Sequence, residues 1–288
     1  MKGRLIVLLL LITQLAFSQD IESFGIFGGL NIPFTIDQGL KKDPRFYGKV
    51  TLRATPVGFS YGYDRVGHGF VITPQFIQVG QKFVIKNTTG GEVGTRSVNM
   101  NYVSVPVALK IHINDMAFFR LSMVAAVNFQ YLIKGQETFT HSASKLKYPP
   151  SVHIPAEPGY TQVYDGVFVP EVSKQVYVDN NQFKPFQVFA AVGLRSDFDL
   201  NDDWSINFDG RANFGIFDPR KSSYLEQLKQ SADAPDLYGQ RREVYLSATV
   251  GIARIIQIKK KHKTKSSGKM VGNKFFAKPR GGKKAPKN

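Results

Sequence analysis

Residues 204–217 read WSINFDGRANFGIF, and this stretch decides the fold. Apolar or small side chains occupy every second position, and serine, asparagine, aspartate and arginine stand between them. Successive side chains of a β-strand point to opposite faces, so this segment has one apolar face and one polar, charged face. The stretch therefore predicts a long strand with a different environment on each side.

Seven further segments follow the same pattern. Pro56 and Pro74 fall inside two of the less regular ones, where a missing backbone donor predicts bulges. The predicted strands, with the first stretch, are residues 23–32, 49–63, 69–83, 98–113, 119–131, 186–200, 204–217 and 244–252.

The connections between these segments alternate between long and short along the whole chain. Short connections lie at residues 64–68, 114–115 and 201–203, whereas 51 residues, 134–184, form the third long one. Long loops at one end and tight turns at the other are typical of outer-membrane barrels, whose turns lie in the periplasm. The sequence thus predicts an all-β fold: an eight-stranded antiparallel up-and-down outer-membrane β-barrel over residues 19–258, with both termini in the periplasm.

The first residues predict export. Lys2 and Arg4 precede an apolar run at residues 5–12, and Ala16-Phe17-Ser18 supplies small residues at a cleavage site, so residues 1–18 are predicted to be a signal peptide. No later apolar run approaches the roughly 20 residues of a membrane-spanning helix. The chain has no cysteine, which excludes disulfides, cysteine-ligated zinc, iron–sulfur clusters and thiol catalysis.

The net charge of +16 is concentrated at the C-terminus. Residues 259–288 contain eleven lysines and one arginine and no acid, so the body is nearly neutral. We expect a disordered periplasmic tail that is either simply solvated or contacts anionic lipid, peptidoglycan or an acidic partner; an exported chain is not expected to bind nucleic acid. The first tail cations are Lys259, Lys260, Lys261, Lys263 and Lys265.

The charged faces of the strands point to a lumen. A barrel of eight strands leaves room only for side chains, and buried charges must be paired, so we expect an ionic plug, with an ion or proton path as the alternative. Periodicity alone does not distinguish this barrel from a soluble, lipocalin-like ligand-binding barrel. The predicted lumen cluster is Lys110, Arg120, Arg195, Asp197, Asp209 and Arg211.

The long segment 134–184 is too long to be a simple connection. It carries Tyr160, Tyr164 and Phe168, which we predict bind a protein partner, since aromatic side chains concentrate binding energy. Asp165-Gly166 predicts a hairpin turn within it.

Two histidines of the same segment carry the enzymatic alternative. His141 and His153, with neighbouring serines, leave open a lipid hydrolase or acyltransferase. No histidine pair has the spacing of a helical zinc site, so the sequence predicts a non-enzyme without a cofactor or metal.

Four features resemble the PorT-like outer-membrane β-barrel family of Bacteroidetes. They are the glycines 25, 28 and 29 with Asn31, the stretch TPQFIQVGQK at 73–82, the stretch YVSVPVALK at 102–110, and the Ser-Gln end of the signal peptide. The resemblance covers residues 19–259 and implies a barrel embedded in outer-membrane lipids; some members are similar to accessory components of the type IX secretion system. The 51-residue loop and the basic tail depart from the family pattern. The expected function is a scaffold or accessory subunit of an envelope complex for secretion or outer-membrane assembly.

Overall fold

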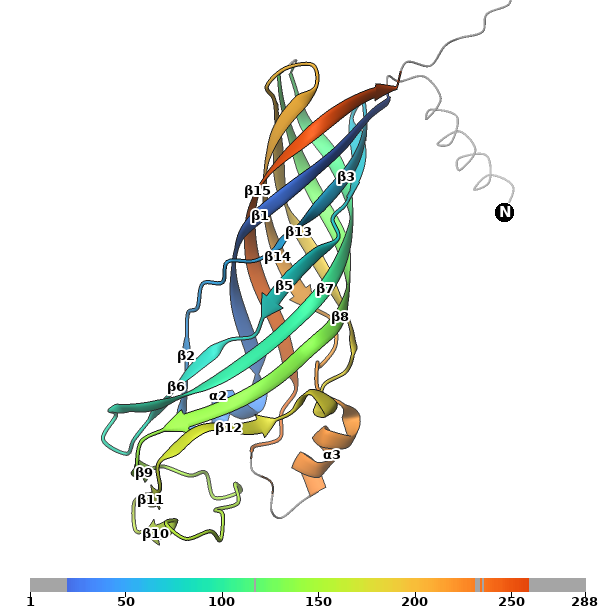
Figure 1. The fold of residues 1–288 in the computed structure, drawn as a ribbon. Helices are drawn as coiled ribbons and strands as arrows, with labels where there is room; N and C mark the ends of the chain where they lie inside the picture. The colour runs from blue at the N-terminus through green and yellow to red at the C-terminus, as the bar shows by residue number, and fades with distance from the viewer. Residues whose placement is uncertain (1–19, 117, 231–233, 235, 259–288) are drawn as a thin grey trace, which may run out of the picture. The chain divides into compact units, whose positions relative to one another are not determined.

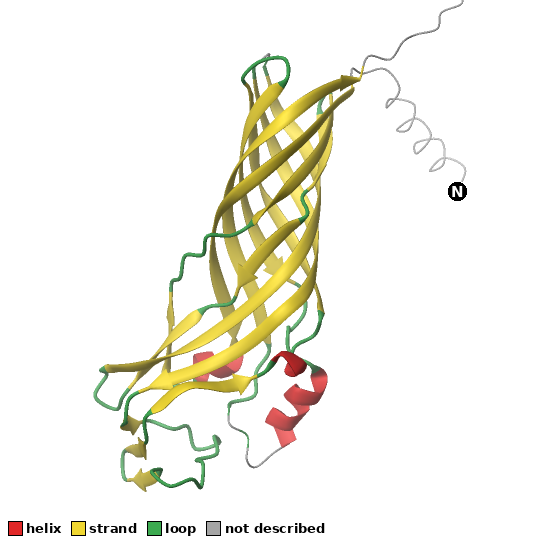
Figure 2. Cartoon of the chain, in the orientation of Figure 1, coloured by secondary structure: helices red, strands yellow, loops and turns green. Residues whose placement is uncertain are grey.

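The computed structural model describes residues 20–116, 118–230, 234 and 236–258. Within these residues the chain forms fifteen strands, twelve of which make one antiparallel sheet (Figures 1 and 2). The predicted signal peptide, 1–18, and the basic tail, 259–288, lie outside the described residues. No helix in the described part of the chain is long and apolar enough to cross a membrane.

The large sheet closes on itself. The closed circuit of antiparallel pairing consists of β1 (Asp20–Asp37), β3 (Val57–Arg65), β4 (His68–Ile72), β7 (Glu92–Asp115), β8 (Phe119–His141), β13 (Phe186–Asp199), β14 (Trp204–Gly215) and β15 (Arg241–Ile258), which returns to β1.

Eight strands form the closed circuit, but the whole sheet has twelve, so the predicted count of eight strands is too low. The predicted strand 69–83 is divided into β4, β5 (Gln75–Val79) and the start of β6 (Lys82–Lys86), with Pro74 at the first break. Two more strands widen the sheet: β2 (Phe46–Lys49) pairs with β6, and β12 (Val172–Val178) pairs with β8. The all-β antiparallel prediction is confirmed.

The wall is apolar outside and polar inside. On β8, Met123, Val127 and Phe129 are exposed, whereas Asn128 and Gln130 are at most 1% exposed. A soluble barrel would have the opposite polarity. The structure therefore contradicts the soluble alternative, and the barrel has the surface of a membrane protein.

The apolar outer surface ends partway along β7. Every second residue from Val103 to Ile113 is an exposed apolar side chain, and these eleven residues span about 25 Å of membrane at a 45° tilt. N-terminal to Val103 the pattern inverts. Val98 and Met100 are fully buried in the interior, and asparagines face outward. The membrane-spanning part of β7 therefore ends at Val103, and the rest of the strand faces water.

A β-bulge marks the same boundary on β8. Tyr102 pairs with Leu132 and Asn101 pairs with Lys134, which leaves Ile133 as an extra residue. The bulge places the exposed Ile133 and the exposed Lys134 next to each other on the outer face. The outer face thus changes from apolar to cationic within one residue.

Short and long connections alternate around the closed circuit, although the second predicted long connection is mostly strand, because β6 and β7 extend into it and leave only residues 87–91. The β3–β4, β7–β8 and β13–β14 turns have two to four residues and lie at the end where β1 begins and β15 ends (Figure 1). The long connections lie at the opposite end and include α2 (Gln38–Lys42), η2 (Asn180–Gln182) and α3 (Ser222–Gln230). We call these the turn end and the loop end.

One part of the wall lacks a regular ladder. β3 begins opposite Gly28, so the rest of β1 has no continuous partner on that side. Asn31 and Arg53 exchange two backbone hydrogen bonds of 2.9 Å in an isolated bridge. The Asn31 side chain donates to the carbonyls of Thr55, at 2.8 Å, and Gln78, at 3.2 Å. Side-chain hydrogen bonds thus close this seam.

We expect Asn31→Leu to lower the free energy of unfolding by about 2 kcal/mol, because it leaves the Thr55 and Gln78 carbonyls without their donor at a buried site. Urea unfolding in lipid vesicles measures the change. Asn114→Leu, at a partly exposed position near the end of β7, is the control and should change it by less than about 0.5 kcal/mol. Equal urea midpoints for the two variants would show that the seam does not depend on Asn31.

Candidate functional site

The predicted lumen cluster forms near the turn end, around Lys110. Its ammonium lies 2.7 Å from the Asp64 carboxylate and 3.7 Å from Oδ2 of Asp197, and the Lys110 side chain is 1% exposed. Lys110 extends inward from β7, Asp64 from β3 and Asp197 from β13. The closed wall thus brings together three strands that are distant in sequence.

Ion pairs continue from Asp197 across the lumen. Arg195 Nε donates to Asp197 Oδ1 at 2.9 Å, and Arg195 Nη1 lies 3.7 Å from Asp209 Oδ2. Arg211 Nε donates to Asp209 Oδ1 at 2.7 Å. Each charge therefore has a partner of opposite sign, as a buried ionic cluster requires.

Arg120 completes the predicted set at the edge of the cluster. It lies 3.5 Å from Asp64 and donates to Asp115 Oδ1 at 3.1 Å. Neither aspartate is among the predicted site residues. Asp64 stands one residue past the predicted end of its strand, on the inward face with the buried Ser60 and Gly62, and extending that alternation by one position would have found it.

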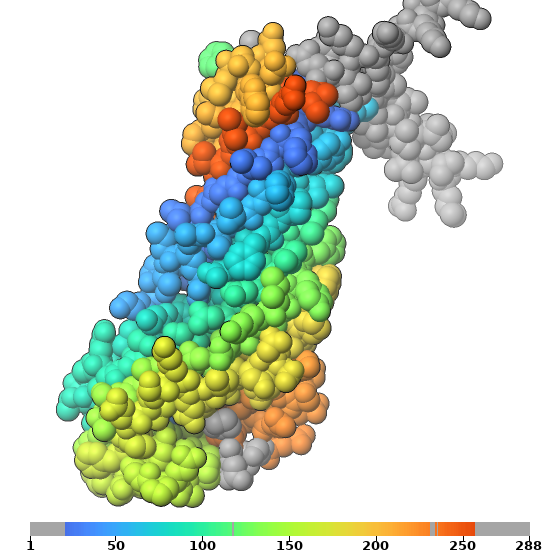
Figure 3. Space-filling model, viewed as in Figure 1, coloured from blue at the N-terminus to red at the C-terminus, as the bar shows by residue number. Residues whose placement is uncertain are grey.

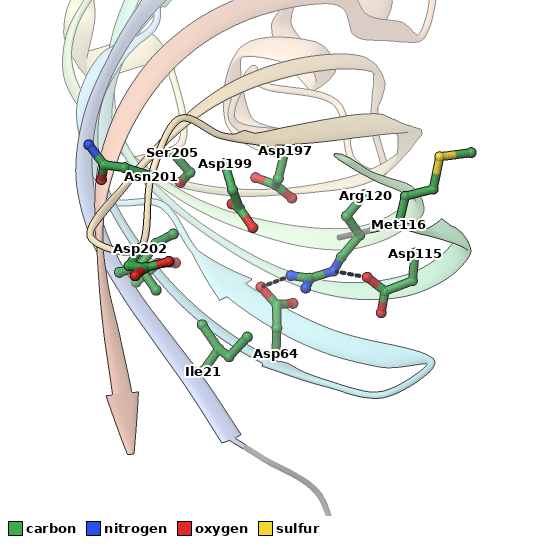
Figure 4. Close-up of a pocket in the computed structure, with 12 residues that line it drawn as sticks. Ile21, Asp64, Asp115, Met116, Arg120, Asp197, Asp199, Asn201, Asp202 and Ser205 are labelled. Atoms are coloured by element: carbon green, nitrogen blue, oxygen red, sulfur yellow. Dashed lines mark hydrogen bonds and ion pairs between the residues drawn. The ribbon is translucent and has the colours of Figure 1, made fainter. Parts of the chain in front are cut away.

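An acidic vestibule opens on the turn-end side of the cluster (Figure 4). It has a volume of about 480 Å³, and five aspartates and Arg120 contribute to its lining. Among the described residues, no group of His, Asp or Glu has the arrangement of a metal site. The aspartates of the vestibule can attract cations. Lys110 and Arg195, in the cluster next to it, repel cations that would move further into the lumen. The five aspartates are Asp64, Asp115, Asp197, Asp199 and Asp202.

Beyond the cluster, polar side chains fill the lumen. Asn128 donates to Asn213 Oδ1 at 2.7 Å, and Gln130 donates to the Tyr245 hydroxyl at 3.0 Å. The cavity next to Arg211 and Asn213 measures about 20 Å³, which is room for about one water molecule. This packing favours a plug over the alternative of an ion path.

A second ionic network, which the sequence analysis missed, lies at the loop end. Arg241 donates to Glu137 Oε2 at 2.9 Å and to Asp37 Oδ2 at 2.7 Å. Arg96 pairs with the same Glu137 and with Asp236, donating to Asp236 Oδ1 at 2.9 Å. These ion pairs join strands β1, β7, β8 and β15 on the loop-end side of the membrane boundary.

Electrostatics hold Glu137 in its charged form. Burial alone would raise its pKa, but Arg241 and Arg96 lower the pKa of Glu137 to about 2. The carboxylate accepts charged hydrogen bonds on both oxygens. Glu137 therefore carries its charge at every physiological pH.

The third long connection is ordered and shorter than predicted. β8 continues to His141, so residues 134–141 belong to the wall rather than to the loop. β9 (Ser144–Leu146), β10 (Thr161–Val163) and β11 (Gly166–Val169) form a separate three-stranded sheet. A hairpin joins β10 and β11, but its two turn residues are Tyr164 and Asp165, one position earlier than predicted, because Gly166 already pairs with Val163.

This small sheet is attached to the loop-end core. Leu146, Val167 and Val169 are buried in the same cluster as Val98 and Met100. Their side chains anchor the sheet to the wall through apolar contacts.

The three predicted partner-binding aromatics have different surroundings. Tyr164 is fully exposed at the hairpin and Phe168 is 50% exposed, whereas Tyr160 packs against the core. Burial raises the pKa of Tyr160, as expected for a covered phenol. Tyr164 and Phe168 are thus available to a partner, and Tyr160 supports the loop.

A groove of about 840 Å³ runs between residues 147–154 and the β10–β11 hairpin. Tyr148 lines it, and the Arg45 guanidinium lies 4.1 Å from the centre of its ring. Asp43 holds that guanidinium at 2.7 Å. The groove therefore has one rigid wall.

The two loop histidines of the enzymatic alternative lie in different surroundings. His141 is buried at the end of β8, where its Nδ1 lies 3.1 Å from the Ser142 carbonyl, and burial lowers its pKa. His153 is exposed beside the groove. The His141 ring has a structural hydrogen bond and a covered position, which are not the features of an accessible general base.

Comparison with known proteins agrees with the class of protein that this wall defines, an outer-membrane β-barrel. Residues 17–219 match the model of the outer membrane protein beta-barrel domain, and the chain belongs to this family. The protein is located in the outer membrane, where its outer face contacts lipid. Comparison with curated proteins gives no significant match.

Solved outer-membrane proteins are distantly similar. OprG of Pseudomonas aeruginosa is 11% identical with a TM-score of 0.40, over 83% of this chain and 97% of that one. Ail of Yersinia pestis is 12% identical with a TM-score of 0.33, over 81% and 98%. The outer membrane protease OmpT of Escherichia coli is 9% identical with a TM-score of 0.38, over 83% and 97%.

Proposed function

We propose that the protein is a non-enzymatic scaffold or accessory subunit of an envelope complex, of the PorT-like kind, and that it binds a protein partner through its third loop. The observation that carries the proposal is the ordered β9–β11 sheet, which presents Tyr164 and Phe168 on an anchored base. Disordered loops lose entropy on binding, and a pre-ordered surface avoids most of that cost.

The filled lumen supports a scaffold over a channel. The ion-paired cluster around Lys110 and the amide layer around Asn213 occupy the space that a solute would need. Buried charges of this kind are costly to separate, so the plug resists opening. Because the lumen is filled, we expect partners to bind at the two ends of the barrel.

We propose that the basic tail provides a second contact on the periplasmic side. Lys259, Lys260, Lys261, Lys263 and Lys265 begin a segment of twelve cations without an acid. Such a segment attracts anionic lipid, peptidoglycan or an acidic protein through screened charge. Contacts of the tail should therefore weaken as salt rises, unlike those of the aromatic loop.

Affinity capture from native outer membranes tests the loop. We expect Tyr164→Ala with Phe168→Ala to lose a captured protein by at least about tenfold in quantitative mass spectrometry, since exposed aromatics dominate such interfaces. Washing at high salt separates the tail contacts, which should be released, from the loop contacts, which should stay.

The matched control is Phe118→Ala with Phe217→Ala, which removes two exposed aromatics outside the third loop, one in the β7–β8 turn and one just after β14. Retention of every captured protein by the Tyr164/Phe168 variant would refute the loop as the contact surface. Heat-modifiable gel migration verifies that both variants are folded.

A further inference from the structure

The outer face of the sheet just beyond the membrane boundary is polar and cationic. It is formed by β2, β6, β7 and β8, which run side by side in the lower part of Figure 1 and contribute to the surface seen in Figure 3. The same face of β7 is apolar from Val103 onward. This polar surface therefore lies at the level of the outer-leaflet headgroups, because the loop end is extracellular in such barrels.

Cross-strand register arranges the surface in rows. Val103 and Tyr131 form the last apolar row. Asn101 with Lys134, and then Asn99 with Gln136, form the next two rows outward. Successive rows are two residues apart, which is about 6.7 Å along the strand.

The row beyond holds two lysines directly opposite each other. Lys49 of β2 pairs with Lys82 of β6, and Lys82 in turn pairs with Ser97 of β7. Lys82 stands between the buried Gln81 and Phe83, so its side chain is on the outer face. Lys49 is directly opposite Lys82 in the ladder and therefore lies on the same face. Opposed like charges repel, and a bound anion between them would remove that repulsion.

Acidic groups do not offset these cations. Among the described outward-facing residues of β2, of β6 at Lys82, and of β7 and β8 between the apolar row and the Ser97 row, none is an aspartate or glutamate. The surface therefore has a net positive charge next to amide and hydroxyl side chains.

We propose that this face, defined by the pairs Lys49–Lys82, Asn99–Gln136 and Asn101–Lys134 and called the headgroup surface, binds the phosphorylated sugar headgroup of an outer-leaflet glycolipid. The lysines contact phosphate through charge-assisted hydrogen bonds. The amides, which both donate and accept, contact sugar hydroxyls. The acyl chains of the same lipid then lie along the apolar face that begins at Val103.

Binding to the full-length protein in detergent tests the proposal with three probes: a bis-phosphorylated disaccharide glycolipid, its dephosphorylated form, and phosphatidylglycerol. We expect the first to bind at least about tenfold more tightly than either of the others, since only it offers both phosphate and sugar. Lys49→Gln with Lys82→Gln should weaken its binding about tenfold and leave the dephosphorylated form unchanged.

The control, Lys147→Gln with Lys229→Gln, removes the same charge from exposed sites elsewhere. It should retain the wild-type affinity within about twofold. Equal weakening by both double variants, or equal binding of phosphatidylglycerol, would reduce the effect to general charge attraction and overturn the proposal. An unchanged affinity of the Lys49/Lys82 variant would overturn it as well.

A third variant, Asn101→Ala with Gln136→Ala, tests the sugar contact. It should weaken binding of both glycolipid forms several-fold and leave phosphatidylglycerol unaffected. Unchanged glycolipid binding would remove the amide rows from the proposal. Heat-modifiable migration of all variants verifies that the barrel is intact.

Discussion

Glu137→Gln is expected to lower the free energy of unfolding by about 3 kcal/mol, because it leaves Arg96 and Arg241 in the loop-end network without the carboxylate that both of them contact. Urea unfolding in lipid vesicles at pH 7, followed by far-UV circular dichroism, measures the loss. Glu92→Gln, an exposed glutamate at the tip of β7, is the matched control and should shift stability by less than about 0.5 kcal/mol.

The same substitution should change the response to acid. The pKa of Glu137 is about 2 in the folded protein, below the usual 4.5, so its stabilising effect is complete above pH 4.5 and is lost as the pH falls toward 2. The wild-type protein should therefore lose stability over that interval more steeply than Glu137→Gln. Parallel pH profiles for the two proteins would contradict the assigned charge.

Lys110→Met should destabilise the plug by about 3 kcal/mol, because Asp64 and Asp197 lose their shared cation inside the lumen. The double variant Lys110→Met with Asp64→Asn removes both members of the closest pair and should regain at least about 1 kcal/mol. Urea midpoints of the wild-type protein, Lys110→Met, Asp64→Asn and the double variant complete the cycle. Purely additive losses would show that the pair is not coupled.

The alternation in the sequence predicted the membrane wall well. In residues 119–131, the residues expected on the apolar face are those that face lipid, and Asn128 and Gln130 lie in the lumen as expected. Five of the six predicted lumen charges pair with one another, and Arg120 joins them through Asp64, because each one stands on the polar face of a long regular strand. A single alternation rule was sufficient wherever one face contacts lipid.

The rule fails beyond the membrane boundary, where the solvent on the outer face becomes water. There the interior holds a large apolar cluster beside the loop-end ion network and the outside is polar, so the extensions of β7 and β8 no longer have the pattern of membrane strands. The alternation therefore predicts a loop at Glu137 and leaves Asp37 and Arg241 outside the predicted strands. No local signal connects these residues, which meet only after the wall closes.

The third predicted strand was divided for a different reason. Its segments β4, β5 and β6 all pair with β7, but Pro74 lies between the first two. Sequence alone indicated a bulge there, and the break is larger because β3 changes partner from β4 to β5 across it.

The bulge at Ile133 and Lys134 also fixes how the barrel can respond to bilayer thickness. In a thicker bilayer, a regular strand can accommodate hydrophobic mismatch by sliding or tilting at modest cost. Here, one step of sliding would move Lys134 and Asn101 into hydrocarbon, at a cost of about 2–4 kcal/mol for a lysine near the midplane and less near the interface. The surrounding lipid, rather than the protein, should therefore change its thickness to match, so this protein should partition into membrane regions whose apolar span is close to 25 Å.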